Sequence, residues 1–527
     1  MIELFLGAAA LATIFYYFYI KPMNYWGERG VKQEGHPLWL FVDSRKSKYG
    51  KESVFDSVVR SYNQFQDTRY HGIYDSTRPI LIIKDPELLK QITVKDFDHF
   101  TDHRNHIELD VDPLWSRNLF FLKGEKWRKM RSILSPSFTS SKMRIMFVLI
   151  SKCTENFVNH FLKKDEKCIE VEMKDTFTRF TNDVIATSAF GVEVDSLEEP
   201  NNEFYSKGKK STTFEGVSKL FMFIRYPLVP KLIEYLQIPF MDPVVYRFFC
   251  DLVDNTIEVR EKNNIIRPDM IHLLMEARKR GPHKKENSGV DTGFATVEKA
   301  NFEGGHASEL TNLDITAQAV LFFFAGFDTV SSLMCFMSHE LAVHPDIQKK
   351  LRDEIEETLA ECGEEVTYEA ILKMKYMDMV ISESLRKWPS TISTDRVCTK
   401  PYTIEAKNAG EKPLHIEKGT LLMIPSVGIH YDPKYYPDPE RFDPERFSDE
   451  NKRKIDPFTY MPFGLGPRLC IGSRFALLET KLLFFHLLLH FELVPVEKTQ
   501  IPLKLSKFTF NLMAENGFWL GLKRLKK

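Results

Sequence analysis

The residues with the clearest chemical potential lie in a glycine-rich loop near the C-terminal end of the chain. Residues 462–472 read PFGLGPRLCIG. Gly464 and Gly466 allow the backbone to turn tightly and to direct N–H groups toward the sulfur of Cys470. A helical pattern starts directly after the loop, and Arg468 adds a positive charge two residues before the cysteine. The partial positive charge at the helix N-terminus and the charge of Arg468 both favour a thiolate at Cys470, which would act as a nucleophile or a metal ligand. The structural alternative is a buried cysteine beside a turn.

A carboxylate and a hydroxyl group lie side by side in a long apolar segment. Residues 319–337 read AVLFFFAGFDTVSSLMCFM, with Asp328 near the centre. An ionised carboxylate is costly in lipid and in a dry protein core alike, so Asp328 is a functional candidate. The length allows a membrane span, but the polar sequence on both sides offers no interfacial anchors and favours an internal helix. Gly326 also needs a reason, because glycine inside a helix costs about 1 kcal/mol relative to alanine.

The cysteine loop resembles the haem-ligand loop of the cytochrome P-450 family, F-x-x-G-x-R-x-C-x-G. The resemblance implies that Cys470 is the axial thiolate ligand of the iron of haem b, and that Arg468 pairs with a haem propionate. An axial thiolate donates electron density to the iron and favours O–O cleavage. Every fixed position of the motif is matched, by Phe463, Gly466, Arg468, Cys470 and Gly472.

The long apolar segment matches the A-G-x-[DE]-T oxygen-binding motif of the same family through Ala325, Gly326, Asp328 and Thr329. The implied role is proton delivery, in which Thr329 hydrogen-bonds dioxygen while Asp328 relays protons from water. Ala325 and Gly326 would leave room for dioxygen and substrate above the haem.

Glu383 and Arg386 lie three residues apart on a predicted helix and are therefore neighbours on one face. Such pairs are usually weak surface ion pairs, but the flanking residues are apolar and E-x-x-R resembles a family motif. Its third member matches Arg446, in the second of two P-E-R-F copies. The resemblance implies a structural network that holds the fold around the haem loop.

Other positions resemble haem-propionate contacts of the family. Trp127 and Arg131 match W-x-x-x-R, and either His103 or Arg104 is expected to contribute to the same charge neutralisation. Relatives often carry a propionate-binding Arg or His where this chain has Ser393. Whether this chain makes a propionate contact from that position stays open.

No segment carries a dinucleotide-binding fingerprint in a βαβ unit, so electrons must come from a partner protein. The resemblance implies NADPH–cytochrome P-450 reductase, with a cytochrome b-type protein as an additional donor. A reductase would dock on a basic face, for which a solvated surface is the plain alternative. The candidate residues are Lys123, Lys126, Arg128, Lys129, Lys452, Arg453 and Lys454.

The N-terminal segment 4–20 reads LFLGAAALATIFYYFYI and has no charged residue. As a helix it reaches about 26 Å, enough for a thin bilayer such as that of the endoplasmic reticulum. Glu3 and the lack of a cleavage site argue against a signal peptide, and Lys21 favours a cytosolic catalytic domain. We expect a single-pass membrane protein with an anchor over 1–22, a hinge over 23–37 and a haem-thiolate catalytic domain over 38–527.

Composition and periodicity indicate a folded, mainly helical protein. There are 72 basic and 73 acidic side chains, which argues against nucleic-acid binding, and seven scattered cysteines exclude a disulfide scaffold. A mobile polar loop is expected over 279–312. Strands are predicted over 78–84 and 420–425, and helices over 145–162, 214–226, 347–359, 377–388 and 475–491. The fold class is mainly α with a smaller β part, and the resemblance implies the cytochrome P-450 fold, a triangular helix-rich prism, with an added anchor helix.

The resemblance covers nearly the whole chain after the anchor, and residues 394–398 and 517–520 look most like insect microsomal members of the family-nine type. It implies mono-oxygenation of lipophilic foreign compounds, such as plant toxins or insecticides. A haem-thiolate isomerase or dehydratase and a catalytically idle haem-binding scaffold are the alternatives. Substrate contacts are expected in the segment after Phe100 and in 214–223, 322–324, 390–394 and 508–512, each of which has core packing as its plain alternative.

Overall fold

The computed structural model describes residues 2–35, 52–75, 77–104, 112–212, 241–267, 269–280, 310–363, 365–507 and 512–526. The predicted helix 214–226 and almost all of the predicted loop 279–312 lie outside these residues. So do most of the pocket candidates after Phe100 and in 508–512, and all of 214–223.

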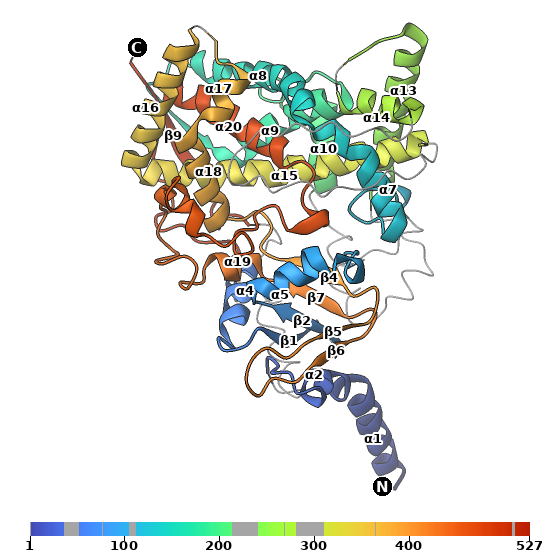
Figure 1. The fold of residues 1–527 in the computed structure, drawn as a ribbon. Helices are drawn as coiled ribbons and strands as arrows, with labels where there is room; N and C mark the ends of the chain where they lie inside the picture. The colour runs from blue at the N-terminus through green and yellow to red at the C-terminus, as the bar shows by residue number, and fades with distance from the viewer. Residues whose placement is uncertain are drawn as a thin grey trace.

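Helices form most of the molecule, as the sequence predicts (Figure 1). The four long helices predicted within the described residues are confirmed to within a few residues at their ends. The helices of the main body are α4 (Val54–Asn63), α5 (Pro86–Lys90), α6 (Pro113–Ser116), α7 (Gly124–Leu134), α8 (Ser140–Leu162), α9 (Met173–Ile185), α10 (Glu203–Thr212), α13 (Pro243–Asn263), α14 (Met270–Arg280), α15 (Asn312–Val343), α16 (Pro345–Cys362), α17 (Tyr368–Lys373), α18 (Lys375–Lys387), α19 (Ser426–His430) and α20 (Ser473–His490).

The smaller β part contains three sheets. The largest has the strand order β1-β2-β7-β4, in which β2 and β7 are parallel and the other pairs antiparallel. Both predicted strands belong to it, and Ile80 of β2 is aligned with Leu421 of β7. The strands are β1 (Tyr70–Asp75), β2 (Arg78–Ile83), β7 (Leu421–Ile424) and β4 (Thr394–Val397), then β3 (Cys168–Glu172), β9 (Trp519–Arg524) and β8 (Phe491–Val494), and finally β5 (Tyr402–Ile404) and β6 (Leu414–Ile416).

Helix α15 crosses the helical part of the molecule and packs against α9, α13, α18 and α20 (Figure 1). It begins with a capping box, in which Thr311 and Asp314 satisfy each other's backbone N–H groups. Its length and composition would allow it to cross a membrane, but 61% of its most apolar part is buried inside the protein. The segment 319–337 is therefore the internal helix that the sequence predicts.

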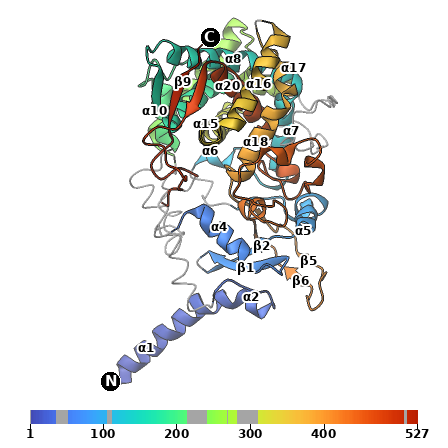
Figure 2. The same cartoon turned by 90° about the vertical axis from the view of Figure 1, so that its left-hand side faces the viewer.

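The N-terminal segment forms α1 (Ile2–Phe15) and the π-helix η1 (Tyr16–Ile20), followed by the 3₁₀ helix η2 (Pro22–Asn24) and α2 (Tyr25–Glu28). Helix α1 extends away from the body of the molecule in both views (Figures 1 and 2). Its described apolar side chains are exposed, including Phe5 at 76%. By length and composition, the bent pair Phe5–Phe18 and Pro22–Glu28 passes as one membrane span.

Candidate functional site

The glycines before Cys470 have the left-handed backbone that the sequence predicts, with φ of +82° at Gly464 and +68° at Gly466. A Cβ atom on Gly466 would lie 1.9 Å from the carbonyl oxygen of Thr93, so no other residue fits there. The backbone N–H of Cys470 donates to the carbonyl of Phe463 over 2.9 Å, which closes the loop. Gly472 is the N-cap of α20, so Cys470 lies three residues before the first residue of a long helix.

The side chain of Cys470 is accessible, although Leu469 and Ser473 on either side are buried. The surrounding protein is nevertheless dense enough that desolvation raises the pKa of the thiol. The N–H groups of Gly472 and Ser473 and the charge of Arg131 act in the opposite direction. The Cys470 sulfur is therefore accessible but closely surrounded by protein. A metal ion bound there would deprotonate the thiol outright.

The structure changes the expected source of positive charge near the sulfur. Arg131, rather than Arg468, is the cation that influences Cys470. The guanidinium of Arg468 turns away to donate to the carbonyls of Thr101, over 2.7 Å, and Leu122, over 2.8 Å. It also lies 4.0 Å above the ring of Trp127.

Arg131, Arg396 and Arg468 form a cluster, in which Arg396 and Arg131 lie close enough to Arg468 to affect it electrostatically. Burial lowers the pKa of Arg468 to about 9, and repulsion by Arg396 and Arg131 contributes. Burial likewise lowers the pKa of Arg131 and of Arg396 to about 10. Uncompensated cations at this depth are costly unless an anion accompanies them.

Two of these side chains have unused donors. The Nε atom of Arg396 is buried without a hydrogen-bond acceptor, and the Arg131 side chain makes no hydrogen bond or ion pair with any residue that the structure describes. The two carboxylates of haem b would supply such acceptors. No group of three or more His, Cys, Asp or Glu side chains among the described residues is arranged to hold a metal ion, so iron at Cys470 needs a carrier such as a porphyrin. The residues present therefore fit haem.

The sequence analysis overlooked Arg396 because it looked for a propionate-binding residue at the position of Ser393. The available signal was the position of this arginine in the segment 394–398, directly before Val397 and Cys398. Strand β4 positions it by pairing Arg396 with Leu422 of β7.

The structure distinguishes His103 from Arg104. His103 is buried, bonds Asp395 over 3.1 Å and stacks on Phe120 with 4.7 Å between ring centroids. Burial lowers its pKa, and Arg396 and Arg468 are close enough to contribute. Arg104 instead forms an ion pair of 2.6 Å with Asp75, away from the arginine cluster.

On α15, the predicted oxygen-binding residues share one accessible face. Ala325 and Thr329 are exposed in the middle of an otherwise buried helix, and the Thr329 hydroxyl donates to the Ala325 carbonyl over 2.5 Å. They are one turn apart and therefore point the same way. Gly326 has a packing reason of its own, because a Cβ atom there would lie 2.7 Å from the side chain of Ile185.

Asp328 forms an ion pair that the sequence analysis did not predict. The ammonium of Lys174, on α9, lies 2.8 Å from the Asp328 carboxylate and also donates to Ser331, over 2.9 Å, and Ser332, over 2.8 Å. With the Asp328 carbonyl at 3.2 Å as a further acceptor, all three N–H bonds of the ammonium group are used. Lys174 is 154 residues from Asp328 in sequence, so only the packing of α9 on α15 brings them together.

The E-x-x-R pair is fully buried and bidentate. Arg386 donates to both oxygens of Glu383, over 2.7 and 2.8 Å, and Arg446 lies 3.5 Å from the same carboxylate. Arg386 also donates to the carbonyl of His430, whose Nε2 accepts the N–H of Met461 over 3.0 Å. The network thus extends from α18 to the segment that leads into the cysteine loop.

Among the pocket candidates, Phe323 is a core residue, packed against Phe190, Phe204 and Phe249. Phe322 and Phe324 are half-buried, and the hydroxyl of Ser390 donates to the carbonyl of Thr329 over 3.0 Å. In the predicted basic face, Arg128 pairs with Asp98 and Lys452 with Asp449.

Comparison with known proteins gives a consistent result. The family model described as Cytochrome P-450 matches residues 34–520. Cytochrome P-450 9e2 of Blattella germanica is 50% identical over 90% of this chain and 89% of its own length. Probable cytochrome P-450 9f2 of Drosophila melanogaster is 41% identical over 99% of both chains, and cytochrome P-450 9c1 of the same organism is 38% identical over 99% of this chain and 98% of its own.

Proposed function

Because the chain belongs to the cytochrome P-450 family of haem-thiolate monooxygenases, we propose that it inserts one oxygen atom from dioxygen into lipophilic foreign compounds. Bound haem supplies the activation of dioxygen and the oxygen transfer. The observation that carries the residue assignment is the position of Arg131. It influences the Cys470 sulfur and also repels Arg468, so a single planar cofactor can use both the thiolate and the arginine cluster.

In this proposal Cys470 is the iron ligand, and Arg131, Arg396 and Arg468 bind the two propionates with Trp127 packed beneath Arg468. Phe463 and Gly472 support the loop backbone around the sulfur. The accessible face of α15 supplies the proton path. Thr329 donates a hydrogen bond toward dioxygen, Asp328 exchanges protons with water, and Lys174 orients the carboxylate.

Electrons are proposed to come from NADPH through cytochrome P-450 reductase, with a cytochrome b-type protein as a second donor. The proposed docking face lies around the start of α7 and the segment 452–454, where Lys126, Lys129 and Arg453 add positive charge. The exposed apolar side chains of α1 support a single-pass anchor in the endoplasmic reticulum membrane, because such a surface is stable in lipid and not in water. Lys21 at its end favours a cytosolic catalytic domain.

The experiment that tests the assignment is the carbon monoxide difference spectrum of the reduced full-length protein in membranes. A strongly red-shifted Soret band is expected for the wild type and its loss for Cys470→Ser. The exposed Cys168 provides the matched control, since Cys168→Ser should leave the band unchanged. A band typical of a neutral ligand in folded wild-type protein would contradict the thiolate assignment.

A further inference from the structure

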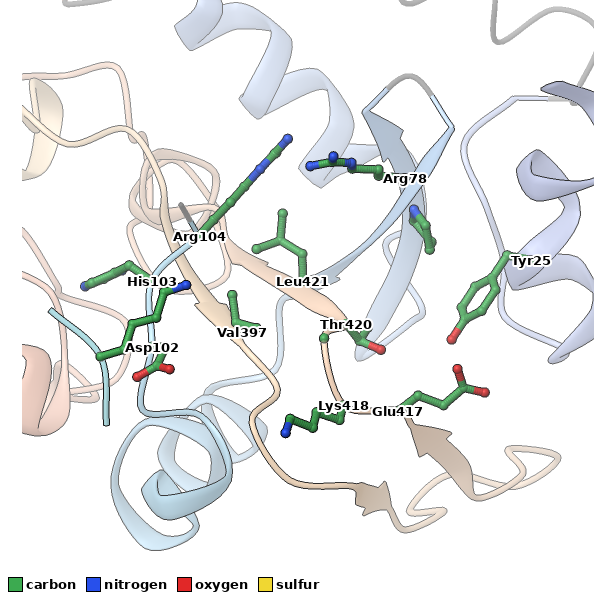
Figure 3. Close-up of a pocket in the computed structure, with 13 residues that line it drawn as sticks. Tyr25, Arg78, Asp102, His103, Arg104, Val397, Glu417, Lys418, Thr420 and Leu421 are labelled. Carbon is green, nitrogen blue, oxygen red and sulfur yellow. The ribbon is translucent and has the colours of Figure 1, made fainter. Parts of the chain in front are cut away.

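A pocket of about 490 Å³ borders the arginine cluster through Asp102, but none of the three clustered arginines and no residue of α15 lines it (Figure 3). Its volume is within the range of small-ligand sites. Its walls come from α2, the start of β2, the segment after Phe100, the residue before α7, the end of β4 and the turn before β7. Six segments of the chain therefore build one concave surface.

Basic side chains dominate the charge of this pocket. Arg78, Lys123 and Lys418 line it, and none of the three forms an ion pair with any residue in the described part of the chain. A fourth cation, Arg104, is held in place by Asp75 over 2.6 Å. Figure 3 shows the side chains of Arg78 and Arg104 directed toward one another on one side of the pocket.

The two acidic side chains in the walls are already neutralised. Asp102 accepts the N–H of Gly124 over 2.9 Å and lies 3.7 Å from Arg468. Glu417 pairs with Arg29 over 3.0 Å. The pocket therefore has a surplus of positive charge, and a compact anion with several oxygen acceptors matches it. A phosphate group is such an anion, and arginine forks suit it particularly well.

The position of the pocket relative to α1 indicates where the phosphate comes from. Tyr25, in the wall, is five residues beyond Ile20, where the apolar segment ends. Helical rise over that distance is about 8–10 Å, comparable with the headgroup layer of a bilayer. Arg29 covers the ring of Tyr25 at 3.6 Å and pairs with Glu417, so the pocket wall is fastened to the segment that leaves the membrane.

We propose that this pocket binds the phosphate group of an anionic phospholipid in the cytosolic leaflet. The inference rests on the membrane anchor of the proposed function. The apolar side chains of Pro79, Val397 and Leu421 in the walls suit the glycerol part of the headgroup. A soluble phosphate ester shares the recognised chemistry and is distinguished from a lipid by the test.

The test uses the full-length, haem-loaded protein in vesicles and follows modification of Arg78 by phenylglyoxal with mass spectrometry. Vesicles of phosphatidylcholine are compared with vesicles that also contain phosphatidic acid. We expect phosphatidic acid to slow modification of Arg78 by about threefold or more, as for a site that is mostly occupied. Arg453, which is exposed and outside the pocket, serves as the internal reference and should react equally in both.

Variants make the test specific to the pocket. Lys418→Glu should abolish the protection of Arg78, whereas Lys373→Glu, the same charge change on exposed α17, should leave it intact. Equal modification of Arg78 in both kinds of vesicle would overturn the proposal. Protection by dissolved glycerol 3-phosphate as strong as that by phosphatidic acid would overturn the lipid as its source.

Two measurements on the same samples separate this inference from the proposed function. If the wild type shows the carbon monoxide band but phosphatidic acid does not protect its Arg78, only the proposal for the pocket is overturned. Failure of the chain to float with phosphatidylcholine vesicles overturns the anchor, and with it the lipid source, while leaving the haem assignment in place.

Discussion

Lys174 is the residue whose removal most directly tests the proton path. Its ammonium fixes the Asp328 carboxylate together with Ser331 and Ser332. In Lys174→Met the carboxylate loses the ion pair that orients it, which weakens proton transfer toward Thr329. We expect product formed per NADPH oxidised to fall by about tenfold or more, since general acid–base catalysis contributes roughly 10²–10⁴-fold.

The haem content distinguishes this role from a structural one. Lys174→Met should lose coupling while its carbon monoxide band per folded protein stays at the wild-type height. Lys163→Met, which removes an exposed partner of Glu198, is the matched control. Unchanged coupling in both Lys174→Met and Thr329→Ala would refute the assignment of Asp328 and Thr329 to proton delivery.

Arg396 is expected to control haem retention. Removing one partner of a buried ion pair leaves an uncompensated charge and typically costs several kcal/mol. Arg396→Gln should therefore release haem to apomyoglobin at least about tenfold faster than the wild type. Arg441→Gln, at an exposed position, should release haem at the wild-type rate. An unchanged rate for Arg396→Gln in folded protein would exclude this arginine from the propionate site.

At the scale of single elements, the cysteine loop offers a matched pair of glycines. Both have positive φ, but a side chain on Gly466 would collide with the backbone of Thr93, whereas one on Gly464 would meet nothing within 4 Å. Gly464→Ala should cost about 1 kcal/mol of strain and retain haem. Gly466→Ala should displace the loop, and its haem content per folded protein should fall severalfold. Equal haem content in the two variants would show that the contact with Thr93 is unimportant.

The same comparison explains what could be predicted about the elements. The cysteine loop and α15 are local motifs, so the residues of each lie within a dozen positions and were found from the sequence. Lys174 reaches Asp328 only because α9 packs on α15, and Arg396 reaches Arg468 through the pairing of β4 with β7. No local pattern contains such contacts. Packing also adds a role at Gly326 that the motif does not contain, since a side chain there would collide with Ile185.

At the scale of the whole molecule, Asp183 links stability to pH. Burial raises its pKa to about 7, although Ser196 and Asn182 donate hydrogen bonds to it. The folded state therefore retains a proton that the unfolded state releases near pH 4. Stability should fall as the pH rises from about 4 to 7, and the full penalty, of the order of 4 kcal/mol, should apply above that range.

Urea unfolding of the haem-loaded protein at several pH values measures this effect. The wild type should lose stability relative to Asp183→Asn between about pH 5 and pH 8, because the amide carries no charge at either pH. The direction of this change in relative stability, rather than its size, tests the assignment. A wild type that gained stability relative to the variant over this range would show that Asp183 is ionised in the folded protein.

The parallel pairing of β2 with β7 has a consequence for synthesis of the chain. Ile80 and its partner Leu421 are separated by more than 300 residues, so the ribosome finishes β2 long before β7 exists. At roughly 5–20 residues per second, the interval is about 20–70 s. Throughout that time one edge of the nascent hairpin β1–β2 presents unpaired N–H and C=O groups beside apolar side chains. We expect the exposure of this edge during translation, rather than the speed of any single helix, to influence the yield of folded protein.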